Sequence, residues 1–206
     1  MVRLSLKKGL GIAAVGAAAV LATTLSTGSA NADTGTMSAT YQVTGNAHVA
    51  KAGFDSKLGP GSFAATLDTA SGQFTGDFKL PATKADFSFM GMPVTADVNL
   101  VEGAKVTGKL TDGAADAKIN FKVLVSNVTV SGQSLNVGDN CTSDGYATID
   151  VKSDSGFSVI NGGTLSSTFT LPPYANCGWA TSIINSVIPG PNNTLSLTLG
   201  QAQIQH

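Results

Sequence analysis

Apolar and polar residues alternate along most of this chain, and turn signals interrupt the alternation about every ten residues. Residues 63–68 alternate in this way, Ser71-Gly72 forms a turn, and residues 74–80 continue the same face, which predicts a hairpin. Strands with one buried and one wet face are typical of antiparallel sheets. The sequence therefore predicts an all-β fold, an antiparallel β-sandwich or barrel of about ten strands.

The remaining strands follow from the same alternation, with Met90 to Pro93 expected as a further turn. They are expected at residues 38–43, 84–89, 94–100, 106–110, 117–125, 128–130, 135–137, 147–151, 165–171 and 194–199.

One segment near the C-terminus has helical spacing instead of alternation. In "NCGWATSIINSVIPG", Asn176 can cap the start of a helix of about three turns, and Pro189-Gly190 can end it. We expect its apolar stripe to lie on the β core as a lid over one end or edge. The stripe consists of Trp179, Ile183, Ile184, Val187 and Ile188.

The first 32 residues have the features of a signal peptide. A basic segment precedes an apolar one over residues 10–25, and Ala30-Asn31-Ala32 matches a cleavage site. The alternative is an uncleaved anchor, but the apolar run is shorter than the ~20 residues that a spanning helix needs. We expect a single secreted β domain at residues 33–206, extracellular or at the cell surface, without a transmembrane segment.

The charge balance disfavours some classes of partner. Loss of Arg3, Lys7 and Lys8 leaves nine basic against thirteen acidic residues, a net charge of −4. Nucleic acids and anionic lipids both require clustered basic residues, so neither is an expected partner. Only 12 % of residues are charged, against a typical ~25 %, so the surface must consist largely of uncharged polar residues.

Cys141 and Cys177 are the two cysteines of the chain. Both follow the signal peptide, and an oxidising compartment allows them to pair. The alternative is a metal site or a catalytic thiol, which the lack of a neighbouring histidine disfavours.

The residues for catalysis or metal binding are sparse. His48 lies in an alternating run, His206 is terminal, and no nucleophile, zinc-protease or phosphate-loop motif is present. Glu102 is the one glutamate and the aspartates are scattered, which disfavours a glycosidase pair. Residues 138–145 resemble a structural turn more than a calcium loop. We expect no catalytic residue, no metal and no cofactor.

The inward positions of the strands combine large aromatic residues with many small ones. Such a mixture either packs a solid core or surrounds a cavity for an apolar ligand. The residues in question, as core or as ligand contacts, are Phe74, Phe78, Phe87, Phe89, Phe121, Trp179 and Ile183.

Two stretches carry a family resemblance: "GSFAATLDTASGQFTGDFKLPATKADFSFMGMPVTADV" and "NCGWATSIINSVIPGPNNTLSLTL". They resemble a family of small secreted β-rich proteins from high-GC Gram-positive bacteria, the actinobacteria. The resemblance implies a bacterial secreted protein with a bridge between Cys141 and Cys177, and it transfers no activity, ligand or catalytic residue.

Together these features favour a non-catalytic structural or interaction module of the cell envelope or exterior. The alternative is a carrier of an apolar ligand, such as an envelope lipid, bound inside the β core. A carrier requires a continuous apolar cavity, which in ligand-binding proteins measures at least ~300 Å³, whereas an interaction module requires an exposed apolar patch.

Overall fold

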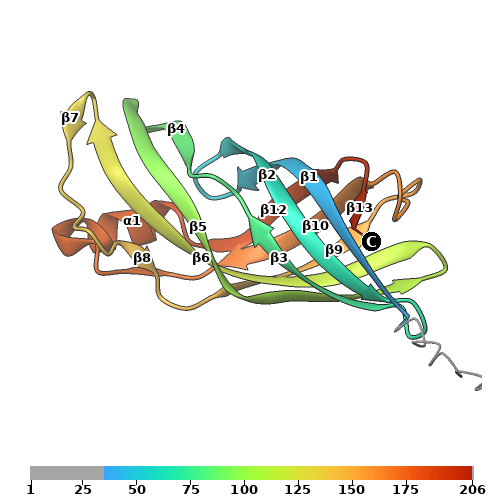
Figure 1. The fold of residues 1–206 in the computed structure, drawn as a ribbon. Helices are drawn as coiled ribbons and strands as arrows, with labels where there is room; N and C mark the ends of the chain where they lie inside the picture. The colour runs from blue at the N-terminus through green and yellow to red at the C-terminus, as the bar shows by residue number, and fades with distance from the viewer. Residues whose placement is uncertain (1–34, 206) are drawn as a thin grey trace, which may run out of the picture. The chain divides into compact units, whose positions relative to one another are not determined.

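The strands of residues 35–205, the part of the chain that this computed structural model describes, wind into a closed antiparallel barrel (Figure 1). The predicted signal peptide lies outside the described residues. The described residues form one compact unit.

Thirteen strands, one 3-10 turn and one helix make up the described part of the chain. The strands are β1 (Thr36–Val49), β2 (Phe54–Asp68), β3 (Gln73–Lys79), β4 (Thr83–Phe89), β5 (Met92–Thr111), β6 (Ala114–Val130), β7 (Gln133–Ser134), β8 (Thr142–Ser143), β9 (Ala147–Ser153), β10 (Gly163–Leu171), β11 (Tyr174–Ala175), β12 (Gly190–Leu199) and β13 (Gln203–Gln205). The 3-10 turn η1 (Gly178–Ala180) leads directly into α1 (Thr181–Val187).

Eight of the strands form the barrel. Their order around it is β5, β6, β9, β10, β12, β1, β2 and β3, and the pairing of β3 with β5 closes the ring. Every pairing is antiparallel, as expected for strands joined by short hairpins. The predicted all-β class with one short C-terminal helix is confirmed, and of the two architectures left open the chain adopts the barrel.

Two-residue turns set the register of three hairpins. Met90-Gly91, Asp112-Gly113 and Ser131-Gly132 all have positive φ at both residues, with angles between 50° and 83°. This is the geometry of a type I′ turn, whose twist matches that of the flanking strands, and glycine adopts it at no steric cost. These turns join β4 to β5, β5 to β6, and β6 to β7.

Different strands form the wall beside β5 in the two halves of the barrel. β3 pairs with the second half of β5, from Val106 to Lys109. β4 then takes the place beside the first half of β5, where Thr83 faces Val98 and Phe89 faces Met92. The barrel therefore has a half walled by β3 and a half walled by β4, and Figure 1 shows β4 and α1 at the same end. We call this the β4 end.

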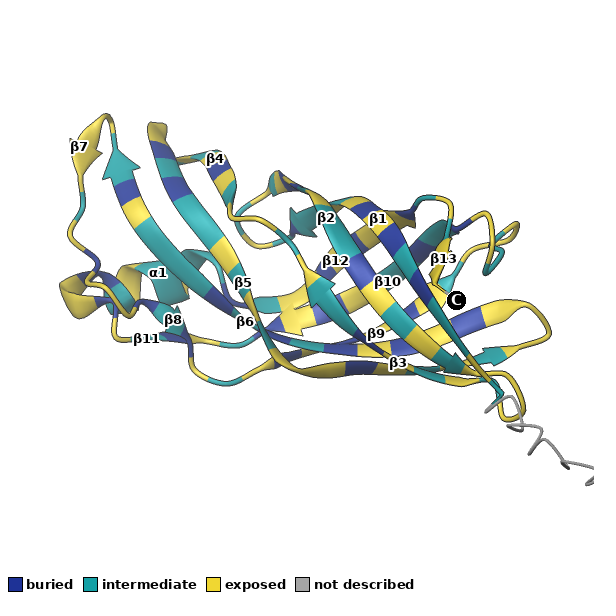
Figure 2. Cartoon of the chain, viewed as in Figure 1, coloured by how far each residue is buried: buried dark blue, intermediate teal, exposed yellow. Residues whose placement is uncertain are grey.

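Buried and exposed residues alternate along the strands, as Figure 2 shows for β1 and β2. In β1 the inward side chains include Tyr41 and Val43, which contribute to the core together with Ile149 and Val151 of β9. The outward positions of β12 are Thr194, Ser196 and Thr198. The interior of the barrel is therefore apolar, and its outer face is rich in hydroxyl groups.

Several predicted boundaries differ from the structure. β2 begins at Phe54, well before the predicted residue 63, because the Gly59-Pro60-Gly61 segment interrupts the alternation yet continues the pairing with β1 as a bulge. Residues 94–100 and 106–110 belong to one strand, β5, and residues 117–130 all belong to β6. β12, predicted from residue 194, starts at Gly190.

The predicted helix of about three turns corresponds to η1 and α1 together, residues 178–187, but its predicted cap is wrong. α1 has seven residues, its N-cap position is Ala180, and no side chain caps it. Asn176 has a φ of 61° and precedes the 3-10 turn, so it belongs to the loop. The short helix depends on tertiary contacts, since a helix of this length is not stable alone.

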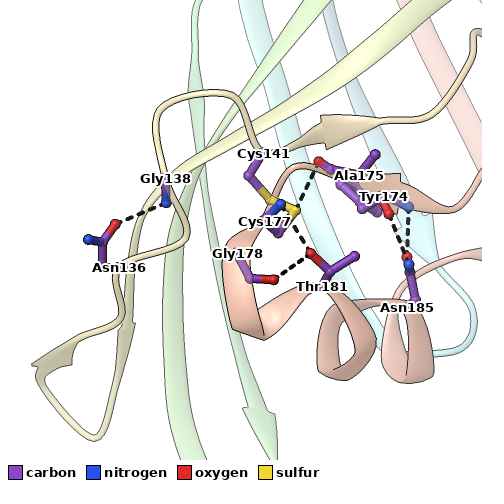
Figure 3. The surroundings of a disulfide bond; sticks show 9 residues. All are labelled: Asn136, Gly138, Cys141, Tyr174, Ala175, Cys177, Gly178, Thr181 and Asn185. Atoms are coloured by element: carbon purple, nitrogen blue, oxygen red, sulfur yellow. Dashed lines mark hydrogen bonds between the residues drawn. A yellow bond between two sulfur atoms is a disulfide. The ribbon is translucent and has the colours of Figure 1, made fainter.

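A disulfide and two polar side chains hold α1 in place (Figure 3). Cys141 and Cys177 are bonded and fully buried, as predicted. The Asn185 side chain accepts a hydrogen bond from the Tyr174 N–H at 2.6 Å and donates one to the Tyr174 carbonyl at 2.9 Å. The Thr181 hydroxyl accepts a hydrogen bond from the Cys177 N–H at 3.2 Å. These contacts fix the helix to β11 and to the loop before β8.

We expect the Cys141→Ser, Cys177→Ser double variant to be less stable than the native chain by about 3 to 4 kcal/mol, because the bond closes a loop of 36 residues in the unfolded chain. Urea unfolding of both proteins, followed by circular dichroism, measures the difference. Adding reductant should lower the stability of the native protein alone, and an equal loss in the variant would contradict this origin.

Candidate ligand cavity

An apolar cavity of about 180 Å³ occupies the β4 end of the barrel. Its wall comes from the eight strands of the barrel together with β4 and β11, with α1 on one side. The polar residues of the wall are Ser56, Glu102, Asn120 and Tyr174, and all others are apolar. A buried water needs two to four polar partners, so this interior favours apolar contents over water.

Four small side chains on neighbouring strands leave the space open. Ala47 of β1 pairs directly with Ser56 of β2, and Ala85 of β4 pairs directly with Ala96 of β5. Two contacts align β2 with β4. The rings of Phe54 and Phe87 stack, and the Thr83 hydroxyl donates a hydrogen bond to the Lys57 carbonyl. Ser56 therefore lies opposite Ala85. We call Ala47, Ser56, Ala85 and Ala96 the small-residue belt.

Aromatic side chains border the belt on the side of the β4–β5 turn. The Phe54 and Phe87 rings stack with centroids 4.8 Å apart and planes inclined by 13°. These rings connect β2 to β4, two strands that do not pair through their backbones in the described part of the chain. Phe89, the last residue of β4, lines the cavity beyond them.

A second cavity, of about 60 Å³, lies in the other half of the barrel. Phe78, Ile119 and Leu197 line both cavities. They come from β3, β6 and β12, which lie on different sides of the barrel, so together they divide its interior. We call these three residues the septum.

The structure places most of the residues singled out from the sequence inside the barrel. Phe78, Phe87, Phe89, Phe121 and Ile183 line the larger cavity. Phe74 lines the smaller one.

Trp179 does not pack on the core, and that prediction was wrong. Its side chain is 67 % exposed and lines neither cavity. The physical reason is that residues 178–180 form a 3-10 turn, which has three residues per turn and so shifts Trp179 out of the phase of the following α-helix. The helix wall of the cavity consists of Ile183, Ile184, Val187 and Ile188.

The Glu102 carboxylate is the charged group on the cavity wall. Both of its oxygens lie 3.2 Å from the Phe78 N–H, which donates to them at the point where β3 has separated from β5. Removal from water raises the pKa of Glu102, and the negative charge of the nearby Asp77 raises it further. The hydrogen bond from Phe78 and the positive charges of Lys105 and Lys79 lower this pKa, but by less. Glu102 thus closes a gap in the backbone pairing at a cost in solvation.

We expect the native protein to lose stability relative to the Glu102→Gln variant as pH rises from about 4 to 7. Burial raises the pKa of Glu102 in the folded chain, so the unfolded chain ionises first and is favoured as pH rises through this window. Glutamine keeps one oxygen for the Phe78 N–H and does not ionise. Urea unfolding at a series of pH values measures the difference, and a pH-independent difference would contradict the raised pKa.

Two further residue groups from the sequence lie away from the cavity. His48 lies on the outer face, where its Nδ1 is 3.0 Å from the Asp55 carboxylate, and both side chains are exposed. In the loop around Cys141, the buried Ser143 hydroxyl accepts a hydrogen bond from the Val123 N–H and donates one to the Gly145 carbonyl. Within residues 35–205 no cluster of three or more potential metal ligands occurs.

The fold and the cavity define a closed eight-stranded antiparallel barrel with a divided apolar interior. Comparison with protein-family models, with curated proteins and with solved structures gave no match. The actinobacterial family resemblance therefore stays a prediction. Among the described residues, no helix is long and apolar enough to cross a membrane.

Proposed function

We propose that this protein binds the end of a single slender apolar chain, such as the acyl chain of a lipid, in the cavity at the β4 end of the barrel. The apolar cavity itself carries this proposal. A void costs stability in proportion to its volume, and about 180 Å³ corresponds to roughly 4 kcal/mol. A purely structural barrel would avoid that cost with larger side chains at the small-residue belt, whereas a ligand recovers it on binding.

The size of the cavity limits the ligand. At about 180 Å³ it is smaller than the ~300 Å³ expected from the sequence for a carrier and typical of pockets for drug-sized ligands. It is comparable with the ~150 Å³ engineered cavity that binds benzene. The proposed ligand therefore inserts one narrow end, and the rest of it extends through the opening beside Ile183, which lines the cavity and is 43 % exposed.

Straight-chain primary alcohols from hexanol to dodecanol test the proposal. A ligand that binds only the folded protein adds about 2.7 kcal/mol at one hundred times its Kd, which raises Tm by about 5 to 10 °C for a chain of this size. We expect the effect to grow with chain length, while polyols of similar mass leave Tm unchanged. Native mass spectrometry of the protein purified from its host should also show a bound apolar molecule. Absence of both effects would reject the proposal in favour of a structural or interaction module.

A further inference from the structure

The outermost segments at the β4 end of the barrel carry no charged side chains. Three segments build it: residues 87–96 around the β4–β5 turn, residues 123–138 around the β6–β7 turn, and residues 172–192 around α1. None of them contains Asp, Glu, Lys or Arg. Charged residues border these segments: Asp86 pairs with Thr95, Asp97 accepts a hydrogen bond from the Asn127 side chain at 2.7 Å, and Asp139 follows Gly138. The β1–β2 hairpin adds Asp55, which lies beside His48, and Lys51, whose ammonium group donates a hydrogen bond to the Asn185 carbonyl of α1 at 3.2 Å.

Large apolar side chains are exposed in the same segments. Met90 and Met92 flank the β4–β5 turn with exposed fractions of 82 % and 40 %. Trp179 and Ile183 lie four residues apart around the start of α1 and are 67 % and 43 % exposed. Ile183 also lines the cavity, so the exposed apolar surface continues into the interior.

The opposite end of the barrel has a different character. Its hairpins contain Asp68, whose carboxylate accepts hydrogen bonds from the N–H groups of Ala70 and Ser71, and Asp112, which forms the β5–β6 turn. The turns of that end thus contain charged residues, whereas the β4–β5 turn, the β6–β7 turn and α1 contain none.

We propose that the β4 end docks on the surface of a lipid bilayer whose headgroups carry no net charge. Charged side chains are costly to move into a bilayer, and the β4–β5 turn, the β6–β7 turn and α1 have none to move. Tryptophan is favoured at the bilayer interface, and methionine and isoleucine gain free energy on leaving water. Docking on anionic lipid would instead require a cluster of Lys and Arg. In this orientation the cavity opens toward the acyl chains.

The transfer of a chain between bilayer and cavity rests on the proposed function, but the docking does not. If both hold, the apolar chain enters the barrel beside Ile183 without crossing water. The Ala85→Leu variant, in which the cavity is filled, separates the two ideas. It should still bind vesicles while it no longer binds the alcohols.

Trp179 is the one tryptophan of the chain, so its fluorescence reports directly on this surface. We expect its emission to shift to shorter wavelength when vesicles of phosphatidylcholine are added, and brominated acyl chains to quench it. Co-sedimentation with the same vesicles gives an independent measure of binding. The Ile183→Asp and Met90→Asp variants should each need at least tenfold more lipid for half-maximal binding.

Ile204→Asp is the matched control, because Ile204 is also an isoleucine, is 38 % exposed, and lies in β13, away from α1 (Figure 1). It should bind vesicles as the native protein does. Three results would overturn the proposal: no spectral shift and no co-sedimentation, equal losses for Ile183→Asp and Ile204→Asp, or binding that requires anionic lipid and disappears at high salt. Each of these would leave the alcohol-binding result unaffected.

Discussion

Replacement of Ala85 by leucine is expected to weaken binding of the straight-chain alcohols at least tenfold while the fold is retained. Ala85 is 2 % exposed, lines the larger cavity, and pairs with Ala96 in the small-residue belt. A leucine side chain adds three carbon atoms at a position that lines the cavity, so it occupies space that the ligand needs. Because these atoms enter an existing void, the overpacking cost of about 1 to 3 kcal/mol should be largely avoided.

The same thermal-shift titration measures this effect, and urea unfolding without ligand checks stability. Ala64→Leu is the control, because Ala64 lies on the exposed face of β2 and should leave alcohol binding unchanged. Ala96→Leu places a leucine at the facing position of the belt and should act like Ala85→Leu. If both belt variants bind as the native protein does, the alcohols bind elsewhere and the cavity is not the ligand site.

The sequence predicted the all-β class because alternation depends only on which face of each strand is buried. The choice between sandwich and barrel was not predictable from it. Closure depends on the pairing of β3 with β5 and of β5 with β6, and on the bulges at Glu102 and Ala104, where the register shifts. A glycine inside a strand, here Gly103, can mark such a bulge, but it does not specify which strands then pair. The Gly59-Pro60 segment was not predicted as part of a strand for a related reason. Its residues are typical of a turn that ends a strand, but it forms a bulge within β2.

The site was predicted in part. Alternation correctly placed Phe87 and Phe89 inside, because β4 is a regular strand. It could not reveal the cavity, which arises because Ala47 and Ser56 lie near Ala85 and Ala96. Strand order brings these two distant pairs together, and the sequence does not specify that order. An unusual run of small residues at inward positions is the one signal that was available, and it is equally typical of a filled core.

Phe78→Ala is expected to extend the range of chain lengths that the barrel accepts. Phe78 is part of the septum between the two cavities, and its ring lies beside that of Phe63, with centroids 6.1 Å apart. Truncation to alanine opens a path toward the smaller cavity. In the native protein, affinity should rise about fourfold for each added methylene, which corresponds to ~0.8 kcal/mol, until the chain reaches the septum.

In the variant this rise should continue for at least two more methylenes before it levels off. The alcohol series, measured by thermal shift, gives both curves. Phe74→Ala is the matched control, since Phe74 is also a partly buried phenylalanine of β3 but lines only the smaller cavity. Both variants lose the packing of a ring, so both should be less stable than the native protein. Only Phe78→Ala removes the barrier between the cavities, and an identical chain-length limit in all three proteins would show that the septum does not set it.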